Sequence, residues 1–234
     1  MAIARLQHPI PSGSKYLFEL IAKAQIQRDH RLFTAIQSGL IFGPLTAKAA
    51  ATVAHKVASQ GDGELDAVMS EAYGYWKKKE RPMPKEGGAT PDSPRAQILA
   101  VKIVIGIIEN DWLLLAAKDE RHDVNEVAEK EILVRIVNED GLRTQLIECV
   151  REGSLKSRLL SRAISNHVPF SSVQIDQICL LLSSDNKRIR YAAMSMLGKD
   201  YLPQDRVREL AQSRLADSDE EIRDYARSLL LRIE

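Results

Sequence analysis

The sequence predicts an all-α protein of 234 residues, and three observations support this fold class. Apolar residues recur at helical spacing through most of the chain. The chain contains only 12 glycines, 9 prolines and 4 phenylalanines, a composition unlike that of an all-β barrel with many turns. From about residue 142, a pattern of helix, polar turn and helix repeats every 32–33 residues, which is typical of stacked helical hairpins.

Four helices are expected in residues 1–80, which we predict to form an N-terminal helical region. Apolar spacing predicts the first two, over 14–28 and 29–40. The third is alanine-rich and is expected over 44–60, because proline stands at its first position and glycine follows its end. The fourth, over 64–79, ends in three lysines, which favour a helix C-terminus through its dipole.

Residues 81–94 are rich in proline and glycine and predict a linker or long loop. The segment ends in Ser93 and Pro94, which are preferred residues for a helix N-cap and a first helical position. A helix is therefore expected over 95–108. Its β-branched residues also suit a strand, but no second strand is near enough to pair with it.

The remainder of the chain, 95–234, is predicted to form one helical repeat domain. Residues 112–117 either extend the preceding helix or start another turn, and a clear apolar stripe predicts a helix over 123–138. Helical hairpins follow, with first helices over 143–150, 173–182 and 206–215, and with second helices over 155–165, 187–197 and 220–233. Because one hairpin cannot bury its apolar face alone, neighbouring hairpins must share it.

The arginine of each second helix has a predicted structural role. Asp217 precedes Arg223 by six residues, and Glu152 precedes Arg158 by the same distance. We expect this carboxylate to bond the arginine and tie the turn to the helix. The middle copy has Ser184 at the acidic position before Arg190. Two further residues of this helix, Tyr191 and Met194, are expected on the exposed face.

Residues 215–229 resemble a HEAT repeat, in which an aspartate turn leads into a helix with the pattern V/I-R-x-x-A-x-x-x-L. The matching residues are Ile222, Arg223 and Ala226, and residues 181–198 match in the same way. The resemblance covers 142–234, and it reaches 95–140 only by extrapolation of the helical pattern. It implies an α-solenoid of helical hairpins, with a concave surface suited to binding.

Charge and motifs favour a binding protein over an enzyme. Thirty-three basic and 32 acidic residues give a net charge of +1, which is unlike a polybasic nucleic-acid-binding protein. The chain has no phosphate-binding loop, nucleophile elbow or zinc-protease motif. His122 and Glu126 share a helix face, but no second pair completes a metal site. We therefore predict no catalytic residue, metal site or cofactor.

We expect the concave face of the repeat domain to hold a partner protein, as an adaptor, an inhibitor or an immunity-type protein would. Arginine and tyrosine are frequent anchors of protein interfaces. On this basis the predicted partner contacts are Arg162, Arg188, Tyr191, Asp224 and Arg227.

The alternative is a nucleic-acid-binding HEAT-like protein, with a DNA glycosylase-like activity as one form of it. Aromatic and basic residues interleave near residue 76, where the expected contacts are Trp76, Lys77, Lys78, Lys79 and Arg81. A second basic strip follows the second helices and comprises Lys156, Arg158, Arg162, Lys187, Arg188 and Arg190. Acidic residues in the last repeat interrupt that strip.

A cytoplasmic location away from membranes is expected. The first residues lack the apolar stretch of a secretory signal. No uncharged stretch is long enough to span a bilayer. The two cysteines, Cys149 and Cys179, have no zinc-binding spacing and are expected to stay reduced.

Overall fold

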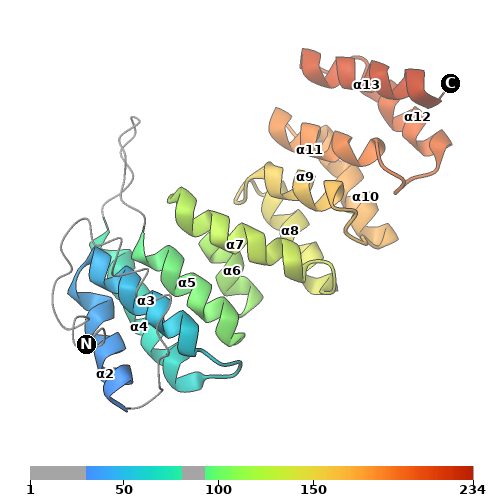
Figure 1. Cartoon of the computed structure of the whole chain (residues 1–234). Coiled ribbons are helices and arrows are strands. Elements are labelled where there is room, and N and C mark those ends of the chain that lie inside the picture. The colour runs from blue at the N-terminus through green and yellow to red at the C-terminus, as the bar shows by residue number, and fades with distance from the viewer. Residues whose placement is uncertain (1–29, 81–92, 234) are drawn as a thin grey trace. The chain divides into compact units, whose positions relative to one another are not determined.

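The structure of the protein, a computed structural model, describes residues 30–80 and 93–233. Within these ranges the chain forms twelve α-helices and one short 3₁₀-helix, with no β-strand (Figure 1). The predicted all-α class is therefore confirmed. The expected helix over 14–28 and residues 81–92 of the expected linker lie outside the described residues. None of the described helices is long and apolar enough to cross a membrane.

The packing of the helices divides the chain into two compact units, and the division falls between Glu131 and Ile132, inside α7 (His122–Arg135). Each unit has its own core of fully buried aliphatic side chains. The division that the sequence suggests, with a linker over 81–94, stays a prediction.

Among the described helices, the first unit contains five whole helices and part of a sixth. They are α2 (His30–Phe42), α3 (Pro44–Val57), α4 (Gly63–Lys79), α5 (Pro94–Ile105), α6 (Asn110–Ala117) and the first part of α7. Helix α5 packs against α3 and α4, and α2 packs against the same two helices (Figure 1). Seven residues of α3, five of them alanines, are buried, and small side chains let neighbouring helices approach closely.

The predicted signal at the start of α5 is effective, but the helix ends three residues before the expected limit of 108. Ser93 is the N-cap, and its hydroxyl oxygen accepts a hydrogen bond from the Arg95 N–H at 3.0 Å, with Pro94 at the first position. Gly106 ends the helix in the left-handed conformation, with φ of 77°, which glycine adopts without strain. The following residues therefore start a separate helix, α6. The β-branched stretch is helical because α3 and α4 bury most of its sides.

The second unit contains three pairs of helices in chain order. The first helices are α8 (Asp140–Arg151), α10 (Ser172–Leu180) with its 3₁₀ extension η2 (Leu181–Ser183), and α12 (Gln204–Ser213). The second helices are α9 (Ser157–Ser165), α11 (Lys187–Leu197) and α13 (Glu220–Ile233), and the last two have the predicted bounds. Helix α11 packs against both α9 and α13, and α10 packs against α8 (Figure 1). Their relation to HEAT repeats stays a prediction.

A buried arginine joins the last two pairs. Arg190 is only 7% exposed, and its guanidinium donates to the backbone oxygens of Ser184 at 2.8 Å and Asp185 at 3.1 Å. It also donates to both carboxylate oxygens of Asp217, at 2.9 and 3.0 Å. Arg223 bonds the backbone oxygen of Asp217 at 2.7 Å. The expected bond from Arg223 to the carboxylate of Asp217, six residues earlier, is thus wrong. The carbonyl at that position accepts instead, and the carboxylate bonds the arginine of the preceding pair.

Asp217 should make the stability of the second unit depend on pH. Burial raises the pKa of this carboxyl, but the Asp219 N–H and the Arg190 guanidinium lower it more, so the pKa lies below its ordinary value. Such a group stabilises the folded state above its unfolded pKa of about 3.9 and loses this contribution as pH falls through the folded pKa.

We therefore expect the urea midpoint of the wild-type protein to fall more steeply below about pH 4 than that of Asp217→Asn, which has no carboxylate to protonate. The asparagine variant should already be the less stable of the two at neutral pH. Parallel pH profiles for the two proteins would contradict the assignment.

Candidate functional site

A surface groove with a volume of about 500 Å³ lies among the second helices of the second unit. Residues of α9 and α11, and residues at and just before the start of α13, form its walls. The lining residues are Ser157, Arg158, Ser161, Arg162, Lys187, Arg188, Tyr191, Asp219, Glu221 and Ile222. Three of the predicted partner contacts, Arg162, Arg188 and Tyr191, are therefore brought together in one hollow.

The amphipathic pattern of α9 and α11 positions these side chains. In α9 the apolar residues 159, 160, 163 and 164 are buried, which leaves 157, 158, 161 and 162 on the groove side. Helix α11 is buried on most of its surface, and only Lys187, Arg188 and Tyr191 are exposed. The exposed stripe of α11 is thus the groove wall itself. Met194, expected on the surface, is fully buried, because the apolar face of α11 is wider than its alanine stripe.

The groove carries an excess of positive charge. Its lining holds four cationic side chains and two carboxylates. One carboxylate is already neutralised, because Lys187 bonds Asp219 at 3.1 Å, and this bond lowers the pKa of the Asp219 carboxyl below its ordinary value. Arg188 is exposed and forms no ion pair within the described part of the chain. The groove is therefore suited to attract a negatively charged group.

An aromatic side chain adds an apolar contact to this groove. Tyr191 is 48% exposed, and its ring centroid lies 6.0 Å from that of Tyr225 on α13. Ile222, which is buried, also belongs to the lining. A tyrosine offers a large contact area with few rotatable bonds, and it therefore loses little conformational entropy when a partner binds.

The other predicted contacts lie outside the groove. Asp224 and Arg227 form an exposed ion pair with each other at 2.6 Å along α13, and neither lines the groove. In the predicted basic strip, Arg190 is buried in its bond to Asp217, and Lys156 precedes α9 without lining the groove. The strip is thus reduced to the four cations of the groove.

The proposed nucleic-acid contacts near residue 76 do not form an aromatic platform with Trp76. This side chain is 7% exposed, and its indole N–H donates to the backbone oxygen of Leu40 at 2.6 Å. It is a core residue that joins α2 and α4. The adjacent Lys77, Lys78 and Lys79 are exposed at the end of α4, and Arg81 lies outside the described residues.

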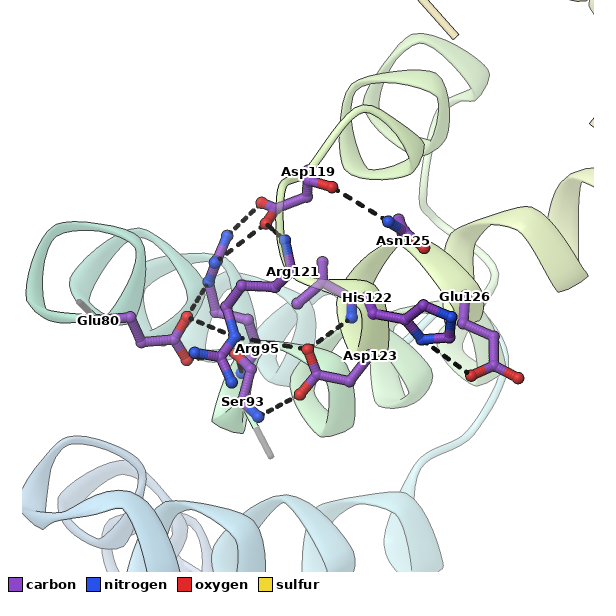
Figure 2. Close-up of polar contacts among 10 residues, drawn as sticks. Glu80, Ser93, Arg95, Asp119, Arg121, His122, Asp123, Asn125 and Glu126 are labelled. Atoms are coloured by element: carbon purple, nitrogen blue, oxygen red, sulfur yellow. Dashed lines mark hydrogen bonds and ion pairs between the residues drawn. The ribbon is translucent and has the colours of Figure 1, made fainter. Parts of the chain in front are cut away.

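A second polar cluster, missed from the sequence, lies in the first unit (Figure 2). Arg95 donates to Glu80 at 2.6 Å and to Asp119 at 2.5 and 3.3 Å, and its side chain is only 6% exposed. Arg121 lies 3.7 Å from Glu80 and 3.4 Å from Asp123. Asp119, Arg121 and Asp123 are neighbours in the sequence, but only tertiary packing brings Glu80 and Arg95 to them.

The cluster holds the two ends of the segment 81–92 together. The Ser93 hydroxyl donates to Glu80 at the end of α4, and the Ser93 N–H donates to Asp123 (Figure 2). Because each carboxylate in it accepts hydrogen bonds or lies beside an arginine, we interpret this cluster as structural. Burial raises the pKa of the neighbouring Tyr73 hydroxyl to about 12, so this group stays protonated at neutral pH.

The His122–Glu126 pair is exposed, with 3.6 Å between Nδ1 and the carboxylate (Figure 2). Among the described residues, no group of three or more histidine, cysteine, aspartate or glutamate side chains could hold a metal ion. Comparisons of the chain with protein-family models and with curated proteins found no significant match. The groove is therefore the candidate functional site of the described residues.

Proposed function

We propose that the protein is a non-enzymatic binding module that holds an acidic segment of a partner protein in the groove of the second unit. The observation that carries this proposal is the convergence of Arg162, Arg188 and Tyr191 on one positively charged hollow. An adaptor, an inhibitor or an immunity-type protein acts in this way, through capture alone. In this proposal the hairpins form a HEAT-like solenoid, and the groove lies on its concave face.

The chemistry of the lining suits acidic residues of a partner. Arginine binds a carboxylate through two parallel hydrogen bonds, which fix both orientation and distance. The groove supplies three arginines, and Tyr191 can pack against an apolar side chain that follows the acidic residue. Arginine and tyrosine truncations at the centre of an interface commonly cost about 2 kcal/mol or more in binding energy.

Nucleic acid is the alternative ligand, since arginine also binds phosphate. Two features of the chain disfavour it. The 33 basic and 32 acidic residues nearly balance, unlike the strongly basic composition that is typical of nucleic-acid-binding proteins. The buried Trp76 offers no base-stacking surface.

The double variant Arg188→Glu, Tyr191→Ala should lose partner capture by a factor of at least about 30, which corresponds to 2 kcal/mol. Helicity and melting temperature should stay nearly unchanged, because both side chains are exposed. Nuclease-treated pull-downs, quantified by mass spectrometry, should show a protein that the double variant loses. Isolated acidic segments of that protein should bind the wild-type chain directly.

Arg227→Glu is the matched control, because it makes the same charge reversal on the neighbouring helix outside the groove. It should retain capture. If it loses as much binding as the double variant, the site is the wider face of α13 and not the groove. If everything captured disappears after nuclease treatment, the nucleic-acid alternative replaces the proposal.

A further inference from the structure

A small pocket in the first unit, far in sequence from the groove, has polar groups in fixed positions. Its volume is about 220 Å³, and it lies between α4 and α6. The lining residues are Ser70, Tyr73, Gly74, Lys77, Trp112, Leu115, Ala116 and Asp119. Apolar and aromatic walls with a few convergent polar groups are typical of small-molecule sites.

Buried charges behind the pocket fix one end of it. Lys102 is 5% exposed and bonds both Asp66 at 2.5 Å and the Ser70 hydroxyl oxygen at 2.6 Å. The same ammonium group lies 5.4 Å from the ring centroid of Trp112, which it holds in place by a cation–π contact. Because Ser70 accepts from Lys102, its own hydroxyl proton remains available to donate to a ligand oxygen.

The cluster of Figure 2 fixes the aromatic wall. The Arg95 guanidinium carbon lies 5.6 Å from the ring centroid of Tyr73, and this ring lies 4.6 Å from that of Trp112. Asp119, also in the lining, has both carboxylate oxygens engaged in hydrogen bonds, from the Arg95 guanidinium and the Arg121 N–H. Lys77 is the remaining charge of the pocket, and it forms no ion pair within residues 30–80 and 93–233.

Gly74 keeps the middle of the pocket open. It lies inside α4, where glycine weakens a helix relative to alanine. A Cβ atom at this position would meet no atom within 4 Å, so no packing contact requires glycine. The absence of a side chain instead exposes the helix backbone between Ser70 and Lys77, which lie about 10 Å apart along the axis.

We propose that this pocket binds a small aromatic carboxylate that carries a second oxygen on the opposite side of its ring. The ring lies over Gly74 against Tyr73 and Trp112. The carboxylate bonds Lys77, whose side chain reaches back toward the preceding turn, as lysine side chains do in helices. The second oxygen accepts a hydrogen bond from the Ser70 hydroxyl. This site is independent of the groove and of its proposed partner.

The two tryptophans provide a direct test with 4-hydroxybenzoate as the probe. In nitrogen–proton correlation spectra, the indole signal of Trp112 should shift with a dissociation constant on the order of 1 mM, while that of the buried Trp76 should not. The neutral 4-hydroxybenzamide should bind at least about tenfold more weakly, because it cannot pair with Lys77. Benzoate, which lacks the second oxygen, should also bind more weakly.

Variants of α4 complete the test. Lys77→Gln should raise the dissociation constant by about tenfold, whereas Lys78→Gln, next to it and outside the lining, should not change it. Gly74→Leu should abolish binding by filling the pocket, with an unchanged or higher melting temperature. The proposal is overturned if 4-hydroxybenzoate shifts neither indole signal at about ten times the expected dissociation constant. Equal binding by the neutral amide would overturn the role of Lys77.

Discussion

Replacing Arg95 by methionine is expected to lower the free energy of unfolding of the first unit by about 3–5 kcal/mol. Methionine preserves much of the side-chain volume but removes the cation that bonds Glu80 and Asp119. Those two carboxylates are only 8% and 14% exposed, so they would remain as poorly compensated charges away from water. Burial lowers the pKa of Arg95, but its bonds to the two acids raise it more, and the arginine stays charged at neutral pH.

Tryptophan fluorescence in urea measures this effect on the first unit, because both tryptophans, Trp76 and Trp112, lie in it. Lys130→Met is the matched control. It breaks an exposed pair with Glu126, whose two side chains are 65% and 44% exposed, and it should change the free energy by less than about 1 kcal/mol. A similarly small change for Arg95→Met would show that the cluster of Figure 2 contributes little to the fold.

Replacing Arg190 by methionine should lower the free energy of unfolding of the second unit by a comparable amount, about 3–5 kcal/mol. The substitution removes the bidentate bond to Asp217, whose side chain is 4% exposed, and leaves that carboxylate buried. It also removes the donors to the backbone oxygens of Ser184 and Asp185, which lie in the loop between η2 and α11. A buried polar group that loses its partner lowers the stability by more than the hydrogen bond itself contributes to it.

Hydrogen exchange measured by mass spectrometry can follow this effect, because the second unit contains no tryptophan. Peptides from α11 and α13 should lose protection in Arg190→Met. The control is Arg206→Met, which breaks a pair with Asp176 in which both partners are about half exposed. Equal protection in the two variants would contradict a structural role for Arg190.

Local signals in the sequence placed several helix ends, whereas the ends expected at 60, 108 and 138 lie three residues earlier in the structure, at Val57, Ile105 and Arg135. Pro44 begins α3, and Ser93 caps α5, as their preferences for these positions predict. The bounds of α11 and α13 follow from the repeat, because a polar turn and an apolar stripe recur in register. These features depend on residues that are close together in the chain, so they can be recognised from the sequence alone.

The candidate groove was predicted in part. Arg162, Arg188 and Tyr191 share it because they lie on the exposed stripes of two adjacent second helices. Asp224 and Arg227 were also predicted as partner contacts, but they lie on a part of α13 that does not line the groove. Whether a residue lines the groove depends on how its helix packs against the neighbouring helices. An alignment of the repeats does not give this packing.

The sequence by itself determined the all-α class, the helix pairs of the second unit and the limits of α11 and α13, because these depend on interactions over a few residues. Tertiary structure alone decided which polar residues are buried. Trp76 bonds Leu40 across 36 positions, Arg190 bonds Asp217 across 27, and Arg95 joins acids on both sides of it. The residues next to an arginine in the sequence do not show whether its side chain is exposed or buried. Exposed and buried arginines differ only in which distant residues fold against them.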